Sequence, residues 1–234
     1  MPLLFERQLK GASLALWQVT EREAELAAQV TPSDVASAAR FGSPGRRREH
    51  LAWRALLRRV LPEGEVVYDA CGAPHVEGCS VHLGVSHCGG AKRNGGRSVN
   101  GGLSGAGTEA LHNLPEETID GGVAALVLSP ERCAVDVEAV ARNFDRVRSR
   151  FVSPVEERLP AAGHPLFLPA MWCVKETLYK YAGRRELDLL ADLQVLELML
   201  PDAGGCGHAV GRVADFERVE MQVERWDDYL IVWT

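Results

Sequence analysis

Two carboxylates close to each other mark the first segment that could do chemistry. Asp136 and Glu138 stand at the end of the apolar run Cys133 to Val137, which has the length of a strand. Side chains two apart in a strand point to the same face, so these acids should project together and repel each other unless a cation lies between them. Mg²⁺ suits such a place, because it takes oxygen ligands and typically combines one or two carboxylates with phosphate oxygens. The alternative is a solvent-facing acidic strand end.

A helix about 35 residues further on supplies a third acid and two lysines. Trp172, Glu176 and Lys180 recur at a spacing of four, so they line one helix face with Lys175 next to them. A structural explanation exists, since a Glu-to-Lys pair at this spacing stabilises an exposed helix by about 0.3 to 0.5 kcal/mol. It does not explain the tryptophan on the same stripe. The two segments together could hold one metal ion and one phosphate chain between a strand and a helix.

The surrounding pattern predicts the elements that would position these residues. Helix starts are indicated by capping-box spacing at Thr20 to Glu23 and by Thr31-Pro32, Ser43-Pro44 and Ser153-Pro154. The third helix should run to about residue 60, and a helix from about Leu166 should stop at Gly183. We expect strands over residues 12–19, 81–85, 123–129 and 133–137, a turn at 72–74, and three tail strands near 208–214, 219–225 and 228–233.

The composition of the chain changes between Cys88 and Gly122. Glycines come in pairs there, with Ser, Asn and charged residues between them, which is typical of a flexible insertion over about residues 89–122. Similar strand and helix signals lie on each side of residue 130. We therefore expect an α+β protein with an N-terminal lobe over 1–129 and a C-terminal lobe over 130–234.

Composition limits the class of function. The chain has 234 residues, 46% apolar and 25% charged, as in soluble globular proteins. A net charge of −6 disfavours a general nucleic-acid binder. No apolar run approaches the roughly 20 residues of a membrane span, and the N-terminus lacks a signal-peptide pattern, so a cytoplasmic protein without membrane contact is expected. The six cysteines form no C-x-x-C pair and are interpreted as thiols in a reducing compartment.

These motifs resemble a known family. Asp-x-Glu followed by Trp-x-x-Lys-Glu-x-x-x-Lys is similar to the 4′-phosphopantetheinyl transferases, in particular the larger, internally duplicated type that modifies carrier domains of fatty-acid, polyketide and nonribosomal peptide synthases. Three further stretches agree in order: the basic segment 48–58, the Gly72-Ala73-Pro74 turn and the Ser86-His87 pair. The resemblance covers about residues 40 to 180. It implies two pseudo-symmetric α/β lobes with the active site in the cleft between them.

The resemblance also implies roles for individual residues. Asp136, Glu138 and Glu176 would hold Mg²⁺ against the pyrophosphate of coenzyme A, and Lys180 would stabilise or protonate the departing 3′,5′-ADP. Glu138, or a metal-bound water beside it, would serve as the base for the carrier-protein serine, with Glu176 as the alternative. The residues implied in coenzyme A binding are Arg48, Arg54, Ser86, His87, Lys175 and Lys180. Ordinary structural roles, as solvated arginines or a structural Ser-His pair, are the alternatives in the first half of the chain.

One position departs from the family pattern. Ala73 stands where these enzymes usually have a lysine that contacts coenzyme A, so one phosphate contact is missing or comes from elsewhere. We expect a monomeric, Mg²⁺-dependent transferase that acts on an acyl or peptidyl carrier protein, with a basic or apolar docking patch for that acidic partner. A non-catalytic homologue that binds coenzyme A or a carrier domain is the main alternative, and an unrelated Mg²⁺-dependent phosphohydrolase is another.

Overall fold

The computed structural model describes residues 3–9, 11–89, 122–202, 205–214 and 217–234. The glycine-rich insertion expected over 89–122 lies outside these ranges except at its two ends. Among the described residues, no helix combines the length and the apolar character needed to cross a membrane.

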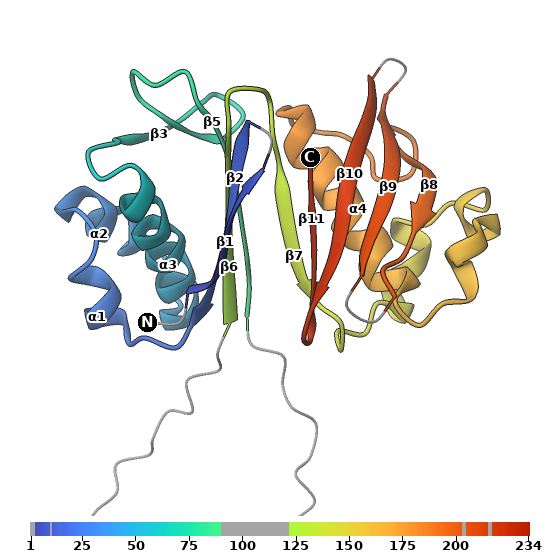
Figure 1. The fold of residues 1–234 in the computed structure, drawn as a ribbon, viewed down its shortest axis with the longest axis horizontal. Coiled ribbons are helices and arrows are strands. Elements are labelled where there is room, and N and C mark those ends of the chain that lie inside the picture. The colour runs from blue at the N-terminus through green and yellow to red at the C-terminus, as the bar shows by residue number, and fades with distance from the viewer. Residues whose placement is uncertain (1–2, 10, 90–121, 203–204, 215–216) are drawn as a thin grey trace, which may run out of the picture.

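The first half of the chain is an antiparallel sheet covered on one face by helices. The strands are β1 (Leu3–Leu9), β2 (Ala12–Val19), β5 (His82–Cys88) and β6 (Gly122–Ser129), in the spatial order β1-β2-β6-β5. The helices are α1 (Glu23–Ala27), α2 (Pro32–Ala38) and α3 (Pro44–Val60). A small hairpin of β3 (Val66–Tyr68) and β4 (Pro74–Val76) follows α3. Figure 1 shows this half in blue and green.

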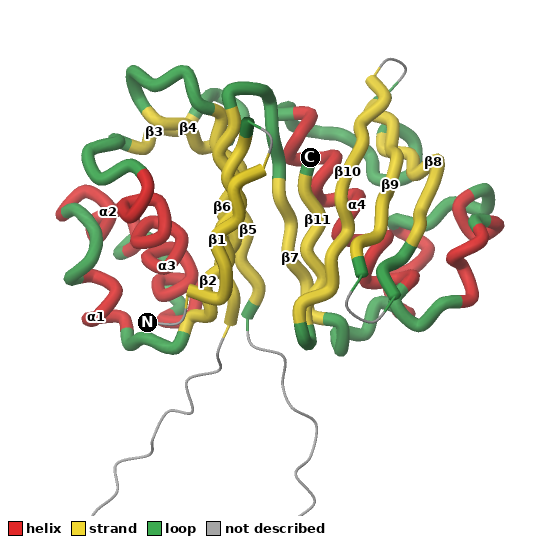
Figure 2. Tube along the Cα trace, viewed as in Figure 1, coloured by secondary structure: helices red, strands yellow, loops and turns green. Residues whose placement is uncertain are grey.

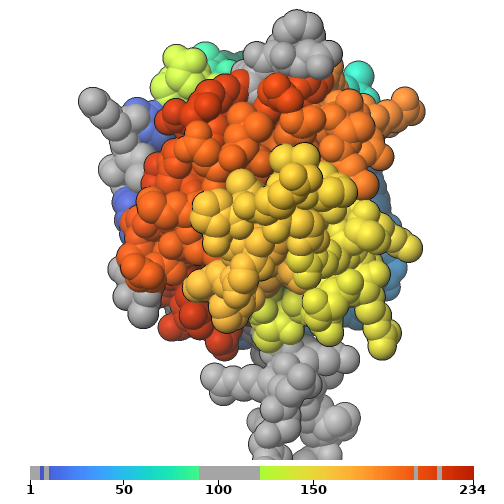
Figure 3. Space-filling view, turned by 90° about the vertical axis from the view of Figure 1, so that its right-hand side faces the viewer, coloured from blue at the N-terminus to red at the C-terminus, as the bar shows by residue number. Residues whose placement is uncertain are grey.

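The second half is a five-stranded antiparallel sheet with one long helix. Its strands are β7 (Val135–Ala139), β8 (Leu193–Met199), β9 (Cys206–Val213), β10 (Glu217–Trp226) and β11 (Tyr229–Trp233), in the order β7-β11-β10-β9-β8. Short 3-10 helices at Asp145–Arg150, Glu156–Arg158 and Pro160–Gly163 lead into helix α4 (Phe167–Ala182). The segment between β7 and α4, yellow to gold in Figure 3, covers much of this side of the molecule.

The two sheets pack face to face, with helices on the outside of each (Figures 1 and 2). β2 shows why both faces of its sheet are covered. Leu14 and Leu16 belong to the core between the sheets, whereas Ala15 and Trp17 pack under the helices of the first half. A strand buried on both faces is a continuous apolar run and does not alternate with polar residues, as the sequence of β2 shows.

The contact between the sheets places two edge strands side by side. β5 ends the order of the first sheet and β7 ends that of the second, and the strands contact each other. Gly84 makes this approach possible, because an added Cβ would lie 2.6 Å from Val127 Cγ1 and 3.0 Å from the Cα of Ala134. The side chains of β5 and β7 are therefore brought together.

Most expected elements are confirmed. The strands at 12–19, 81–85, 123–129, 133–137 and in the tail match β2, β5, β6, β7, β9, β10 and β11, and the helices starting at Thr31, Ser43 and near Leu166 match α2, α3 and α4. Gly183 ends α4 in the left-handed conformation, as expected. The helix expected at Ser153 is only a 3-10 turn, and the first helix is capped at Arg22, two residues later than predicted.

The sequence pattern did not indicate β1, β3, β4 or β8. The mixed architecture with several sheets is consistent with the α+β class, whereas internal duplication with pseudo-symmetric lobes stays a prediction.

The close packing at Gly84 gives a stability prediction. Gly84→Ala should lower the free energy of unfolding by about 1 to 3 kcal/mol, because the new methyl group would push β5 away from β7. Urea denaturation measures this change. Gly42→Ala is the matched control, since a Cβ at Gly42 meets no atom within 4 Å. Equal stability of the two variants would contradict the close approach.

Candidate active site at the junction of β5, β7 and α4

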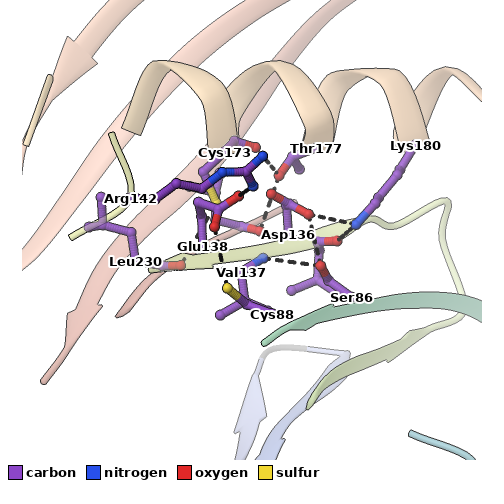
Figure 4. Close-up of polar contacts among 12 residues, drawn as sticks. Ser86, Cys88, Asp136, Val137, Glu138, Arg142, Cys173, Thr177, Lys180 and Leu230 are labelled. Carbon is purple, nitrogen blue, oxygen red and sulfur yellow. Dashed lines mark hydrogen bonds and ion pairs between the residues drawn. The ribbon is translucent and has the colours of Figure 1, made fainter. Parts of the chain in front are cut away.

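The two carboxylates of β7 lie between the sheet and helix α4. The odd-numbered residues Val135, Val137 and Ala139 belong to the core between the sheets. Because side chains alternate along a strand, Asp136 and Glu138 point the other way, where α4 contacts β7 (Figure 4). Both are buried, with 6% and 4% of their surface exposed. The expected projection of the two acids on one face is confirmed.

Asp136 is held from both sides of the junction. Lys180 Nζ lies 2.7 Å from Asp136 Oδ1 and 3.1 Å from the carbonyl oxygen of Val135. Ser86 Oγ of β5 donates to the same Oδ1 at 2.8 Å and accepts from the backbone N–H of Val137 at 3.2 Å. One carboxylate oxygen therefore joins a strand of the first sheet to the helix of the second half (Figure 4).

Glu138 has a different set of partners. Its Oε2 lies 2.5 Å from Arg142 Nη1, and its Oε1 accepts from the backbone N–H of Ala139 at 3.0 Å. The thiol of Cys88 lies 3.3 Å from Oε1. Burial raises the pKa of that thiol to about 12, and the nearby Glu138 carboxylate adds to the effect. Cys88 is therefore a neutral donor to Glu138 and not a nucleophile.

The third acid, Glu176, is half-buried on α4, one turn before Lys180. Its pKa is raised, first by burial and then by the charge of Asp136, with a smaller contribution from Glu138. The three acids therefore lie near enough to act on one another electrostatically. Within the described ranges, however, no group of three or more His, Cys, Asp or Glu side chains is arranged to hold a metal ion.

Trp172 packs in an aromatic cluster next to the site. Its ring packs against Phe151 at 5.2 Å and Phe144 at 5.6 Å between centroids. The Arg142 guanidinium lies over Phe144 and Trp172, at 5.0 and 5.6 Å from their ring centroids. The tryptophan thus belongs to an aromatic cluster beneath the arginine that binds Glu138. Sequence reasoning missed Arg142, although its position four residues after Glu138 was the available signal.

The structure corrects the expectation for Lys175. Its side chain is fully buried, and Nζ lies 2.8 Å from Glu156 Oε1 and donates to the carbonyl oxygens of Leu189 and Leu193. These contacts fix α4 to the segment before it and to the start of β8. Lys175 therefore has a structural role and does not face the acids of β7.

Arg54 is also placed differently from the expectation. It is 2% exposed, lies 3.0 Å from Asp34 of α2 and donates to the hydroxyl of Tyr68 at 3.0 Å. The guanidinium stacks over the ring of Trp53 at 4.2 Å. Because a buried arginine with these partners ties α2 and the β3 strand to α3, it is not free to bind a ribose phosphate.

His87 and Arg48 lie at the border of the first half. His87 Nδ1 is 3.1 Å from Glu49 Oε2 of α3, and this contact lowers the pKa of Glu49. Arg48, half-buried beside Glu49, lowers the same pKa further through its charge. Of the residues expected to bind the coenzyme, Ser86 and Lys180 therefore meet at Asp136, whereas His87 and Arg48 gather around Glu49.

A pocket adjoins this site. Its volume is about 250 Å³, and it is lined by the turn before β4, by β5, by the segment preceding β7 and by the end of α4. Lys180 belongs both to the pocket wall and to the Asp136 pair. A ligand in the pocket would therefore lie beside the first acid of β7.

The buried position of Lys175 predicts a loss of stability on substitution. Lys175→Met should lower the free energy of unfolding by about 3 to 5 kcal/mol, because Glu156 would remain buried without its cation. Chemical denaturation monitored by tryptophan fluorescence measures this. Unchanged stability combined with weaker coenzyme A binding would instead put Lys175 at the ligand site.

Comparison with known proteins adds one finding. The model of the 4′-phosphopantetheinyl transferase superfamily matches residues 132–233, which include β7, all of α4 and the last strand of the sheet. No curated protein matches the chain. Over residues 132–233 the chain is therefore similar to the 4′-phosphopantetheinyl transferase superfamily.

Proposed function

We propose that the protein transfers the 4′-phosphopantetheine group of coenzyme A to a serine of an acyl or peptidyl carrier protein and releases 3′,5′-ADP. The observation that carries this proposal is the meeting of Ser86 and Lys180 at Asp136, next to Glu138. Lys180 and both acids lie in the region that the superfamily model matches. Buried acids beside a lysine and an adjoining pocket suit the handling of a phosphate chain.

Mg²⁺ is the proposed cofactor, and Asp136, Glu138 and Glu176 are the residues that would hold it. The three carboxylates are hard oxygen donors of the kind that Mg²⁺ prefers. The pKa of Glu176 is raised first by burial and then by the charge of Asp136, and a cation beside the two acids would offset the second of these effects. Lys180 contacts Asp136, and Arg142 contacts Glu138. When the metal ion binds, each of these cations would have to move away from its carboxylate or contact it together with the ion. The ion would neutralise charge on the diphosphate of the substrate.

Lys180 is the proposed stabiliser of the leaving group. Its side chain is 32% exposed, although Nζ contacts the buried Asp136, so it can reach both the pocket and the acid. An ammonium at this position would offset the charge that develops on the departing nucleotide phosphate. Ser86 would keep Asp136 oriented, and His87 and Arg48 are proposed to contact the coenzyme at the border of the first half.

The base that takes the proton of the carrier-protein serine would be Glu138 or Glu176. A general base works best when its pKa lies near the working pH. The raised pKa of Glu176 favours that residue on this criterion. Glu138 is instead engaged by Arg142 at 2.5 Å, so it would have to leave that contact to reach the serine.

Direct transfer to a carrier protein tests the function. The protein should be incubated with coenzyme A, Mg²⁺ and an apo acyl or peptidyl carrier protein, and the acceptor examined by intact-protein mass spectrometry. Addition of one phosphopantetheine is expected. Asp136→Ala should reduce the initial rate at least about a hundredfold, whereas Asp228→Ala, which changes an exposed aspartate after β10, should not.

Two controls make this result decisive. Circular dichroism of Asp136→Ala should show the native spectrum, so that lost transfer is not lost folding. Coenzyme A binding without transfer to any of several carrier types would contradict the enzyme and favour a non-catalytic binder.

A further inference from the structure

The pocket beside Lys180 has an unbalanced charge. Three cationic residues line it, namely Lys180, Arg184 and Arg185, and its lining within the described chain contains no Asp or Glu. Lys180 already contacts the carboxylate of Asp136 at 2.7 Å. The remaining positive charge in the lining comes from the two arginines, and it would favour an anionic ligand.

Residues with positive φ flank the two arginines. Gly183 ends α4 with φ +61°, and Glu186, on the other side of the pair, also has a positive φ of 62°. A non-glycine residue in this conformation is uncommon. Arg184 and Arg185 lie between these two turns and border the pocket.

Arg185 is fixed to the opposite wall. Its Nε donates to the carbonyl oxygen of Cys71 at 2.9 Å, and a Cβ added at Gly72 would lie 3.3 Å from its Nη2. This bond uses only one of the five N–H donors of the guanidinium, so it orients the group without using the two terminal nitrogens. The arginine of the second half therefore reaches across the pocket to the turn of the first half.

The turn itself contributes no charge to the pocket. Its lining residues are Cys71, Gly72, Ala73 and Pro74, and Ala73 has only a methyl group to present. The backbone N–H of Ala73 is bonded to Asp69 Oδ1 at 2.9 Å, which fixes the turn. The positive charge on this side of the pocket thus depends on Arg185, from the segment after α4.

We propose that Arg184 and Arg185 together bind a phosphate group of coenzyme A in this pocket and determine the protein's affinity for that anionic substrate. The inference rests on the proposed function. Guanidinium groups bind phosphate through paired N–H donors, which gives both charge and geometry. The pocket is smaller than a typical site for a whole ligand, so it would hold one part of the coenzyme, with the remainder extending past Lys180 toward Asp136.

Calorimetric titration with coenzyme A tests this assignment. Combined Arg184→Ala and Arg185→Ala should weaken binding of coenzyme A about tenfold or more, while Arg184→Lys with Arg185→Lys should retain most of the affinity. Ala73→Lys, added to the double alanine variant, should restore part of the lost affinity by placing an ammonium on the turn. Arg218→Ala is the matched control, because Arg218 is exposed and pairs with Glu197 on the outer sheet.

The outcomes separate this inference from the proposed function. If the unchanged protein and the double alanine variant bind coenzyme A with equal affinity, the role of the arginines is overturned and the proposed function is not. A lower melting temperature with unchanged coenzyme A affinity would do the same, since the arginines would then only stabilise the C-terminal end of α4. An unchanged coenzyme A affinity with a raised KM for the carrier protein would assign them to that partner instead. No binding of coenzyme A by the unchanged protein would overturn both proposals.

Discussion

The site depends on one buried carboxylate that receives donors from both halves of the chain. Asp136 Oδ1 accepts from Ser86 of β5 and contacts the ammonium of Lys180 on α4. The Ser86 contact requires the edge strands β5 and β7 to lie side by side, and that approach leaves no room for a Cβ at Gly84. If the two sheets separated, Asp136 would lose Ser86, and a buried charge with fewer partners is costly. The packing of the apolar core between the sheets and the geometry of the acids are therefore linked.

Charge compensation explains which polar residues belong to the site and which belong to the framework. Lys175 and Arg54 satisfy buried acids, Glu156 and Asp34, with partners fixed entirely within one half of the molecule. Lys180 and Arg142 also meet acids, but their side chains are 32% and 54% exposed. A partly exposed cation can change partners at a smaller cost than a buried one. Lys180 and Arg142 are thus the residues that can respond to a ligand.

The sequence predicted the local features of the site better than the distant ones. The alternation of a strand placed Asp136 and Glu138 together, and the four-residue spacing put Glu176 and Lys180 on one face of α4. Lys175 directly precedes Glu176, about 100° around the helix, and its buried ammonium is paired with Glu156, which lies 19 residues earlier. Arg54 likewise pairs with Asp34 of another helix. Spacing within one element cannot reveal such partners. β8 was not predicted either, and its pairing with β9 shifts register between Val195 and Glu197.

The central claim is that coenzyme A binds where β7 and α4 meet, with its phosphates beside Lys180 and the acids of β7. A crystal structure of the protein grown with coenzyme A and Mg²⁺ tests this most directly. The account predicts phosphate density next to Lys180, and a metal ion bound by Asp136, Glu138 and Glu176 between those acids and the phosphates. Coenzyme A bound on another surface, with the Lys180 to Asp136 contact intact and no ion at the acids, would contradict it.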